Sequence, residues 1–143
     1  MQRVILILLF ATSASAADCT AIFTLSCPGA TAGLSTASCA ASDGSYFDLW
    51  QFSGTAGQSV TIDMTSSSFD AFLILLDPNG KPVADNDDIA SGNTNSRITF
   101  TLTSSGTWTV AANALKANQF GTYTITLGGC ATTIAPRRRA ATH

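Results

Sequence analysis

The most constraining feature of the sequence is an apolar run of six residues at positions 71–76, which no polar residue interrupts. Such a run is too short for a typical helix and suits a strand that is covered on both faces. It ends in Asp77-Pro78-Asn79-Gly80, a turn in which proline presets the backbone at the second position and glycine accepts a positive φ. A short return strand over 81–84 leads into the acidic loop 85–88. The centre of the chain is therefore expected to be a β-hairpin followed by an acidic loop.

Most of the remaining chain alternates apolar and polar residues with a period of two, which is typical of half-buried strands. The clearest case is 58–65, where Val60, Ile62 and Met64 share one face. No segment shows a sustained apolar period of 3.6 residues. We predict an all-β fold, an antiparallel β-sandwich of about eight strands. Its other strands are expected at 21–25, 33–37, 46–53, 97–103, 107–112 and 122–128.

The two ends of the 143-residue chain differ from its body. Arg3, an apolar run over 4–10 and Ala14-x-Ala16 form the pattern of a signal peptide, cleaved after Ala16 or Ala17. The apolar run is too short to span a bilayer. We therefore expect a signal peptide at 1–17, one domain at 18–130 and a basic disordered tail at 131–143. The protein is expected to be secreted or periplasmic.

The charge distribution argues against a nucleic-acid partner. All nine acidic residues are aspartates between 18 and 135, where the basic residues are Lys81, Arg97 and Lys116 alone. Nucleic-acid recognition needs a basic face, which this body lacks. Arg137, Arg138 and Arg139 form a charge run near the chain end, which we interpret as a solvated tail. We expect a monomer whose partner is an extracellular protein or polysaccharide.

Four cysteines in a chain with an export signal predict two disulfides and no free thiol. Residues 19–27 alternate like a strand, and an extended chain over this range would hold Cys19 and Cys27 about 26 Å apart, which is too far for a disulfide. We favour Cys27–Cys39 around a Pro28-Gly29 turn, with Cys19–Cys130 joining the two ends of the domain. The alternative, Cys19–Cys39 with Cys27–Cys130, stays open.

A series of short motifs runs in a fixed order through the body of the chain. It comprises the segments 47–52, 56–60, 68–70, 77–80, 86–88, 95–98, 105–110 and 121–125. This series resembles the bacterial pre-peptidase C-terminal domain, a β-sandwich appended to many secreted peptidases and similar to the collagen-binding domain of bacterial collagenases. The resemblance implies a jelly-roll-like arrangement. It also implies a non-catalytic role in binding, or in the secretion or localisation of extracellular enzymes.

We expect no enzymatic activity, because the sequence assembles no catalytic constellation. The single histidine, His143, is the last residue of the basic tail, and the cysteines are expected to be oxidised. A glycosidase would need a pair of carboxylates. Asp63 and Asp70 are the candidates for such a pair, but no supporting motif flanks either of them.

A calcium site is the best chemical candidate. Calcium prefers hard oxygen ligands, and Asp85, Asp87 and Asp88 are dense enough to supply several of them. Asp70 or Asp43 would join them in space. The alternative is that these side chains cap turns by accepting from nearby amides, and we favour it.

Two further expectations depend on whether these aspartates bind calcium or cap turns. Asp70 is expected to accept from loop amides or to pair with Arg97, because a buried carboxylate needs such partners. A calcium site would make the protein a calcium-dependent cell-surface adhesion or structural module, which is the alternative to a binding or accessory domain.

The aromatic residues are expected to serve the core. Trp50, Trp108 and Tyr123 lie on predicted strands, where aromatic side chains are more often buried than exposed for binding. Tyr46, at the start of its strand, is expected to be the exposed one.

Overall fold

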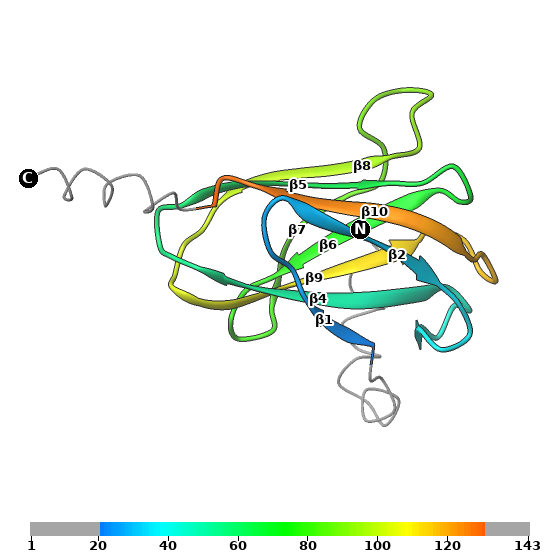
Figure 1. The fold of residues 1–143 in the computed structure, drawn as a ribbon, viewed down its shortest axis with the longest axis horizontal. Coiled ribbons are helices and arrows are strands. Elements are labelled where there is room, and N and C mark those ends of the chain that lie inside the picture. Colours follow the sequence, from blue (N-terminus) through cyan, green and yellow to red (C-terminus); the bar gives the residue numbers. More distant parts are fainter. Residues whose placement is uncertain (1–20, 131–143) are drawn as a thin grey trace, which may run out of the picture.

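A computed structural model describes residues 21–130 of the protein, which form ten β-strands and no helix (Figure 1). No membrane-crossing helix is therefore present within this range. The strands are β1 (Ile22–Thr24), β2 (Gly29–Leu34), β3 (Cys39–Ala40), β4 (Tyr46–Gly54), β5 (Ser59–Thr65), β6 (Ala71–Leu76), β7 (Pro82–Asn86), β8 (Ser96–Thr101), β9 (Gly106–Ala114) and β10 (Gly121–Gly128).

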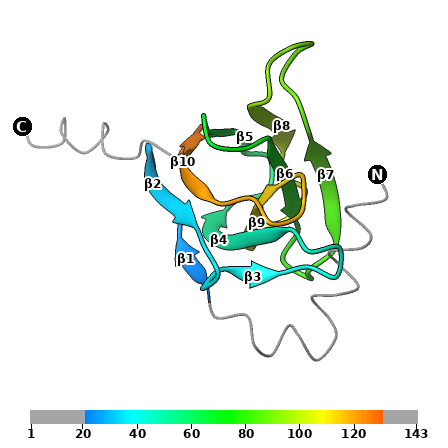
Figure 2. The ribbon, with the colours of Figure 1, turned by 90° about the vertical axis from the view of Figure 1, so that its right-hand side faces the viewer.

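The strands form two sheets that face each other (Figure 2). Sheet A has the order β1-β4-β9-β6-β7, with β3 also paired to β4, and sheet B has the order β2-β10-β5-β8. Neighbouring strands are antiparallel except β1, which runs parallel to β4. The predicted fold class, an all-β antiparallel β-sandwich, is confirmed, with ten strands in the described residues where we expected about eight.

The central hairpin forms as the sequence predicts, as β6 and β7. Leu73 and Leu75 point into the core between the sheets, whereas Phe72 and Ile74 pack in a second apolar cluster with Phe47. The strand is thus covered on both faces, which explains why no polar residue interrupts it.

The N-terminal part of the chain departs from the prediction. β2 begins at Gly29, where we expected a turn, and it ends at Leu34, so the strand expected at 33–37 is misplaced. The reason is its pairing with β10, which runs from Gly29 opposite Thr126 to Leu34 opposite Gly121. β3, in a segment expected to be a loop, pairs Cys39 with Phe47 of β4.

The aromatic side chains follow the prediction for the core. Trp108 and Tyr123 are fully buried between the sheets, and Trp50 is 5% exposed. Tyr46, expected to be exposed, is half-buried because its ring packs on Phe120, with 4.9 Å between the ring centroids.

A buried polar network connects the two sheets. Asp48 lies on β4 of sheet A and is 2% exposed. The hydroxyl of Tyr123, on β10 of sheet B, donates to Asp48 Oδ2, and Trp50 Nε1 donates to that hydroxyl at 2.9 Å. Burial raises the pKa of Asp48, and the hydrogen bonds from Tyr123 and Ser38 oppose that rise.

The disulfide pairing differs from the one we favoured. Cys27 is bonded to Cys130, with their Cα atoms 6.3 Å apart. The pairings Cys27–Cys39 and Cys19–Cys130 are therefore wrong. The turn at Cys27 and Pro28 leads directly into β2, whose pairing with β10 leaves Cys27 beside the end of β10 and away from Cys39. Cys39 is also disulfide-bonded, and the pairing that remains, with Cys19, falls on a residue outside the described range.

The Cys27–Cys130 disulfide is expected to contribute much of the stability. It joins residues 103 positions apart, and in the chain-entropy model such a bond contributes about 4–5 kcal/mol. Replacing both cysteines by alanine should lower the free energy of unfolding by about that amount in urea titrations followed by tryptophan fluorescence. Ser26→Ala, at the exposed neighbouring position, is the control. A double variant with the wild-type urea midpoint would contradict this expectation.

Candidate functional site

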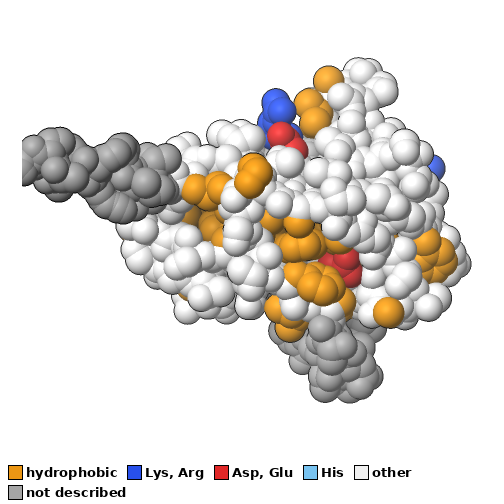
Figure 3. All heavy atoms as spheres, viewed as in Figure 1, with side chains coloured by type: hydrophobic (Ala, Val, Ile, Leu, Met, Phe, Trp, Pro, Cys, Tyr) orange, Lys and Arg blue, Asp and Glu red, His pale blue; other side chains and the backbone are white. Residues whose placement is uncertain are grey.

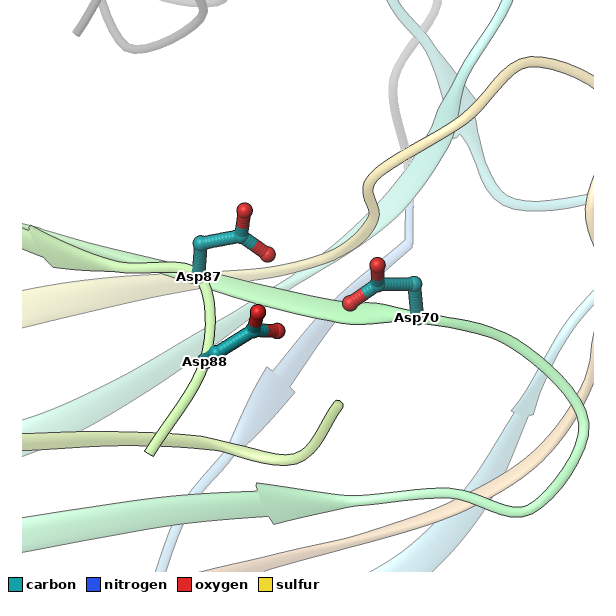
Figure 4. A group of neighbouring side chains, drawn as sticks. All are labelled: Asp70, Asp87 and Asp88. Atoms are coloured by element: carbon teal, nitrogen blue, oxygen red, sulfur yellow. The ribbon is translucent and has the colours of Figure 1, made fainter. Parts of the chain in front are cut away.

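Three carboxylates gather at one end of sheet A. Asp70 precedes β6, and Asp87 and Asp88 follow β7. Because β6 and β7 are antiparallel, with Leu73 opposite Asn86, the start of one strand lies beside the end of the other. One carboxylate oxygen from each residue lies within 4.8 Å of the other two, and the three side chains point toward one another (Figure 4). We call Asp70, Asp87 and Asp88 the acidic cluster.

The environment of Asp70 is unfavourable for its charge. Burial, followed by the charges of Asp87 and Asp88, raises the pKa of Asp70 from 3.8 to about 6. Lys116 lowers this pKa, but less strongly. Asp70 Oδ1 is buried and has no hydrogen-bond partner among residues 21–130. A bound cation would relieve both the repulsion and the unsatisfied oxygen.

The donor set of the acidic cluster fits calcium. Calcium takes six to eight hard oxygen ligands, from carboxylates, backbone carbonyls and water. Asp88 is exposed, while Asp70 and Asp87 are half-buried, so the cluster is open to solvent on one side. The three side chains would supply part of such a coordination shell, and carbonyl groups and water would supply the rest.

The other predicted ligands lie outside the acidic cluster. Asp85 lies on β7 opposite Ile74 and does not belong to the group of converging carboxylates. Asp43 Oδ1 accepts from the Ser45 backbone N–H at 2.9 Å and from the Ser45 hydroxyl at 2.6 Å. Asp43 therefore caps its own turn, as the favoured alternative to metal binding describes.

Arg97 pairs with Asp63 and not with Asp70. Its Nε lies 2.6 Å from Asp63 Oδ1, and its Nη2 lies 3.2 Å from Asp63 Oδ2. The expected pair with Asp70 is wrong because Arg97 and Asp63 stand directly opposite each other on β8 and β5 of sheet B, while Asp70 directly precedes β6 of sheet A. Capping amides are also not found at Asp70 Oδ1 among the described residues.

Lys116 is the residue near this site that the sequence did not indicate. It lies in the loop between β9 and β10, and that loop passes Asp70 because Leu115 N–H donates to the Asp70 carbonyl at 2.8 Å. No spacing in the sequence links positions 70 and 116. Only the pairing of Ala71 with Ala114 brings them together.

The chain was compared with protein families and with curated proteins. Residues 46–114 match the family model of the bacterial pre-peptidase C-terminal domain. This range includes the whole acidic cluster. No curated protein sequence matches the chain.

Solved structures share the fold over 74% of this chain. The pre-peptidase C-terminal domain of collagenase from Bacillus anthracis is 16% identical, is covered over 91% of its length and has a TM-score of 0.49. PliG of Salmonella Typhimurium, a periplasmic inhibitor of g-type lysozyme, is 18% identical, with 95% coverage and a TM-score of 0.50. CorA of Methylomicrobium album BG8, a surface-associated copper-binding protein, is 10% identical, with 96% coverage and a TM-score of 0.55.

The fold, the motif series and the family match describe a β-sandwich similar to the bacterial pre-peptidase C-terminal domain. Residues 46–114 match the model of that family, so the resemblance seen in the sequence is confirmed.

The acidic cluster predicts a specific pH dependence of stability. Because folding raises the pKa of Asp70, the folded protein holds this proton more tightly than the unfolded chain. The resulting stabilisation is fully present below about pH 4 and is lost as the pH rises through about 6. Asp70→Asn should flatten this part of the stability profile. At pH 7.5 it should raise the free energy of unfolding by at most about 1 kcal/mol, since solvent screens a partly exposed group.

The measurement is urea unfolding at several pH values in buffer containing a chelator. Asp85→Asn, on the same hairpin but outside the acidic cluster, is the matched control. If the free energy of unfolding of Asp70→Asn falls between pH 4 and 7 as steeply as that of the wild type, the pH dependence does not come from Asp70.

Proposed function

We propose that the protein is an exported, non-catalytic binding or accessory domain that acts on an extracellular protein or polysaccharide. The observation that carries this proposal is the family match over 46–114, which spans β4 to β9 and contains the acidic cluster. Domains of this family accompany secreted enzymes. The sequence motifs that carry the resemblance belong to the β-sandwich scaffold.

Several features support export. The N-terminal pattern is that of a signal peptide, and the Cys27–Cys130 disulfide suits an oxidising compartment. Proteins with the same sandwich include a periplasmic inhibitor and a surface-associated protein. N-terminal sequencing of the exported protein should begin at Ala17 or Asp18, and a retained Met1 would contradict cleavage.

The polar groups of the described residues support a binding role over catalysis. Asp48 is held by Tyr123, and Asp63 is paired with Arg97, so neither carboxylate is available as a general acid or base in an open cleft. His143 lies outside the described residues. These arrangements hold the scaffold together.

The binding role is tested with the purified mature protein. We expect it to be retained on one of a panel of immobilised polymers, collagen, chitin, cellulose or peptidoglycan, or to capture a defined protein from culture supernatant. Protein unfolded by urea and reductant is the control for non-specific adsorption. Turnover of any of these polymers by the purified protein, lost on unfolding, would contradict a non-catalytic role.

A second candidate is a calcium-dependent adhesion or structural module of the cell surface. The specific observation in its favour is the convergence of Asp70, Asp87 and Asp88, together with the buried Oδ1 of Asp70 that lacks a donor. Calcium would neutralise the repulsion from Asp87 and Asp88 that adds to the effect of burial in raising the pKa of Asp70.

Calcium binding predicts a ligand-dependent gain in stability. At a calcium concentration 100 times the dissociation constant, the gain would be about 2.7 kcal/mol. Combining Asp87→Asn with Asp88→Asn should abolish the rise in melting temperature, whereas Asp85→Asn should keep it. A melting temperature that responds to neither millimolar calcium nor chelator would contradict calcium binding by the acidic cluster.

A further inference from the structure

The two sides of the sandwich differ in how their edge strands are protected. On one side the edges are β1 and β2, and on the other they are β7 and β8 (Figure 2). β7 carries Pro82 and Asp85, and β8 carries Arg97, which are residues that discourage pairing with another strand. By contrast, residues 19–42 contain no charged residue at all, and β1 and β2 lie within this segment.

The side of the sandwich with edges β1 and β2 also exposes apolar side chains. Ile22 is 48% exposed and Phe23 is 43% exposed, and both lie on β1. Figure 3 shows that uncharged side chains cover most of the surface in the view in which β1 and β2 are seen. Among residues 21–130, this side therefore lacks the charged side chains that keep an edge strand apart from other chains.

Within the described part of the chain, no strand pairs with the outer edge of β2. Leu127 N–H donates to the Pro28 carbonyl at 2.9 Å, and bonding positions alternate along an antiparallel pair. Ala30, Ala32 and Leu34 therefore bond to β10. The N–H and C=O groups of Gly29, Thr31 and Gly33 point away from sheet B.

The fold does not require glycine at position 33. Gly29 has a φ of 144°, and a Cβ there would lie 2.2 Å from the Ile125 carbonyl oxygen, so the fold itself needs that glycine. A Cβ at Gly33 would meet only the Gly121 carbonyl oxygen, at an ordinary 3.6 Å. A glycine inside a strand costs stability and often marks a place where another backbone approaches closely. Gly33 is such a glycine, on an exposed edge.

The sequence of this edge is self-complementary. Residues 29–33 read Gly-Ala-Thr-Ala-Gly, which is the same in both directions. In an antiparallel pair with a second copy centred on Thr31, glycine would face glycine, alanine would face alanine and threonine would face threonine. The three outward-facing residues would meet their counterparts in the hydrogen-bonded positions of the new pair.

We propose that the β2 edge is a self-association surface, where β2 of a second copy pairs antiparallel about Thr31 and joins the two B sheets across a two-fold axis. Such an interface is isologous, because the same patch serves both copies. Main-chain hydrogen bonds supply the attraction, as in other cases of strand addition. From the sequence alone we expect a monomer, whereas pairing through β2 predicts a dimer. The two predictions differ in the association state of the protein in solution.

The test is sedimentation analysis of the wild-type protein from low micromolar to about 1 mM, where weak dimers are detectable. We expect a concentration-dependent monomer–dimer equilibrium. Thr31→Pro removes an N–H that points away from β10, so it should keep the fold and weaken dimerisation by about tenfold or more. A wild-type protein that stays monomeric over the whole range overturns the proposal.

The matched control is Thr99→Pro on the opposite edge. Leu102 N–H donates to the Gln58 carbonyl and Arg97 N–H donates to Asn86 Oδ1, so the intervening N–H of Thr99 also points away from its sheet. Thr99→Pro should dimerise like the wild type. If Thr31→Pro and Thr99→Pro weaken dimerisation equally, the β2 edge is not the interface.

The register has its own test. Thr31→Lys and Thr31→Asp each place like charges opposite each other at the two-fold axis and should be monomeric, because such pairs repel. Mixing the two variants places opposite charges there and should restore a dimer. A mixture that stays monomeric, although both variants show the wild-type circular dichroism, overturns pairing centred on Thr31.

Discussion

The carboxylate of Asp48, buried between the two sheets, is the constraint that the rest of the sandwich has to satisfy. A buried carboxylate is costly unless hydrogen bonds compensate for the lost water. Here the compensation comes from Tyr123 of the opposite sheet, with Trp50 donating to the same hydroxyl. Because these bonds form in only one arrangement of the sheets, the network fixes how β4 and β10 lie across the core. Removing one partner would leave a buried polar group unsatisfied.

The other carboxylates of the described residues are compensated in other ways. Asp63 is neutralised by Arg97 on the outer face of sheet B, and Asp43 is held by its own turn. The acidic cluster is where this compensation is incomplete, since Asp70 Oδ1 has no donor among the described residues and its pKa is raised. Groups left unsatisfied in this way cluster at functional sites, although structural networks also perturb pKa values. The β6–β7 hairpin, at the centre of the family match, holds this cluster in place.

The hairpin and the half-buried strands could be predicted because their signals are local: an uninterrupted apolar run, a proline–glycine turn and strict alternation. β2 was misplaced because glycine, alanine and threonine carry little apolar contrast, so only its pairing with β10 shows where it begins. The disulfide and the Arg97–Asp63 pair were mispredicted for a related reason, since each depends on which strands become neighbours. The role of Asp48 could not be predicted either, because its donor, Tyr123, lies 75 positions away in the sequence.

The arrangement of the two sheets depends most directly on the coupling between Asp48 and Tyr123, which a double-mutant cycle with Asp48→Asn and Tyr123→Phe measures in urea unfolding. A hydrogen bond to a charged group in the interior predicts a coupling free energy of about 1.5–3 kcal/mol, with each single variant destabilised. Single-variant effects that add to within about 0.5 kcal/mol would contradict this coupling, because the two sheets would then be joined without this bond.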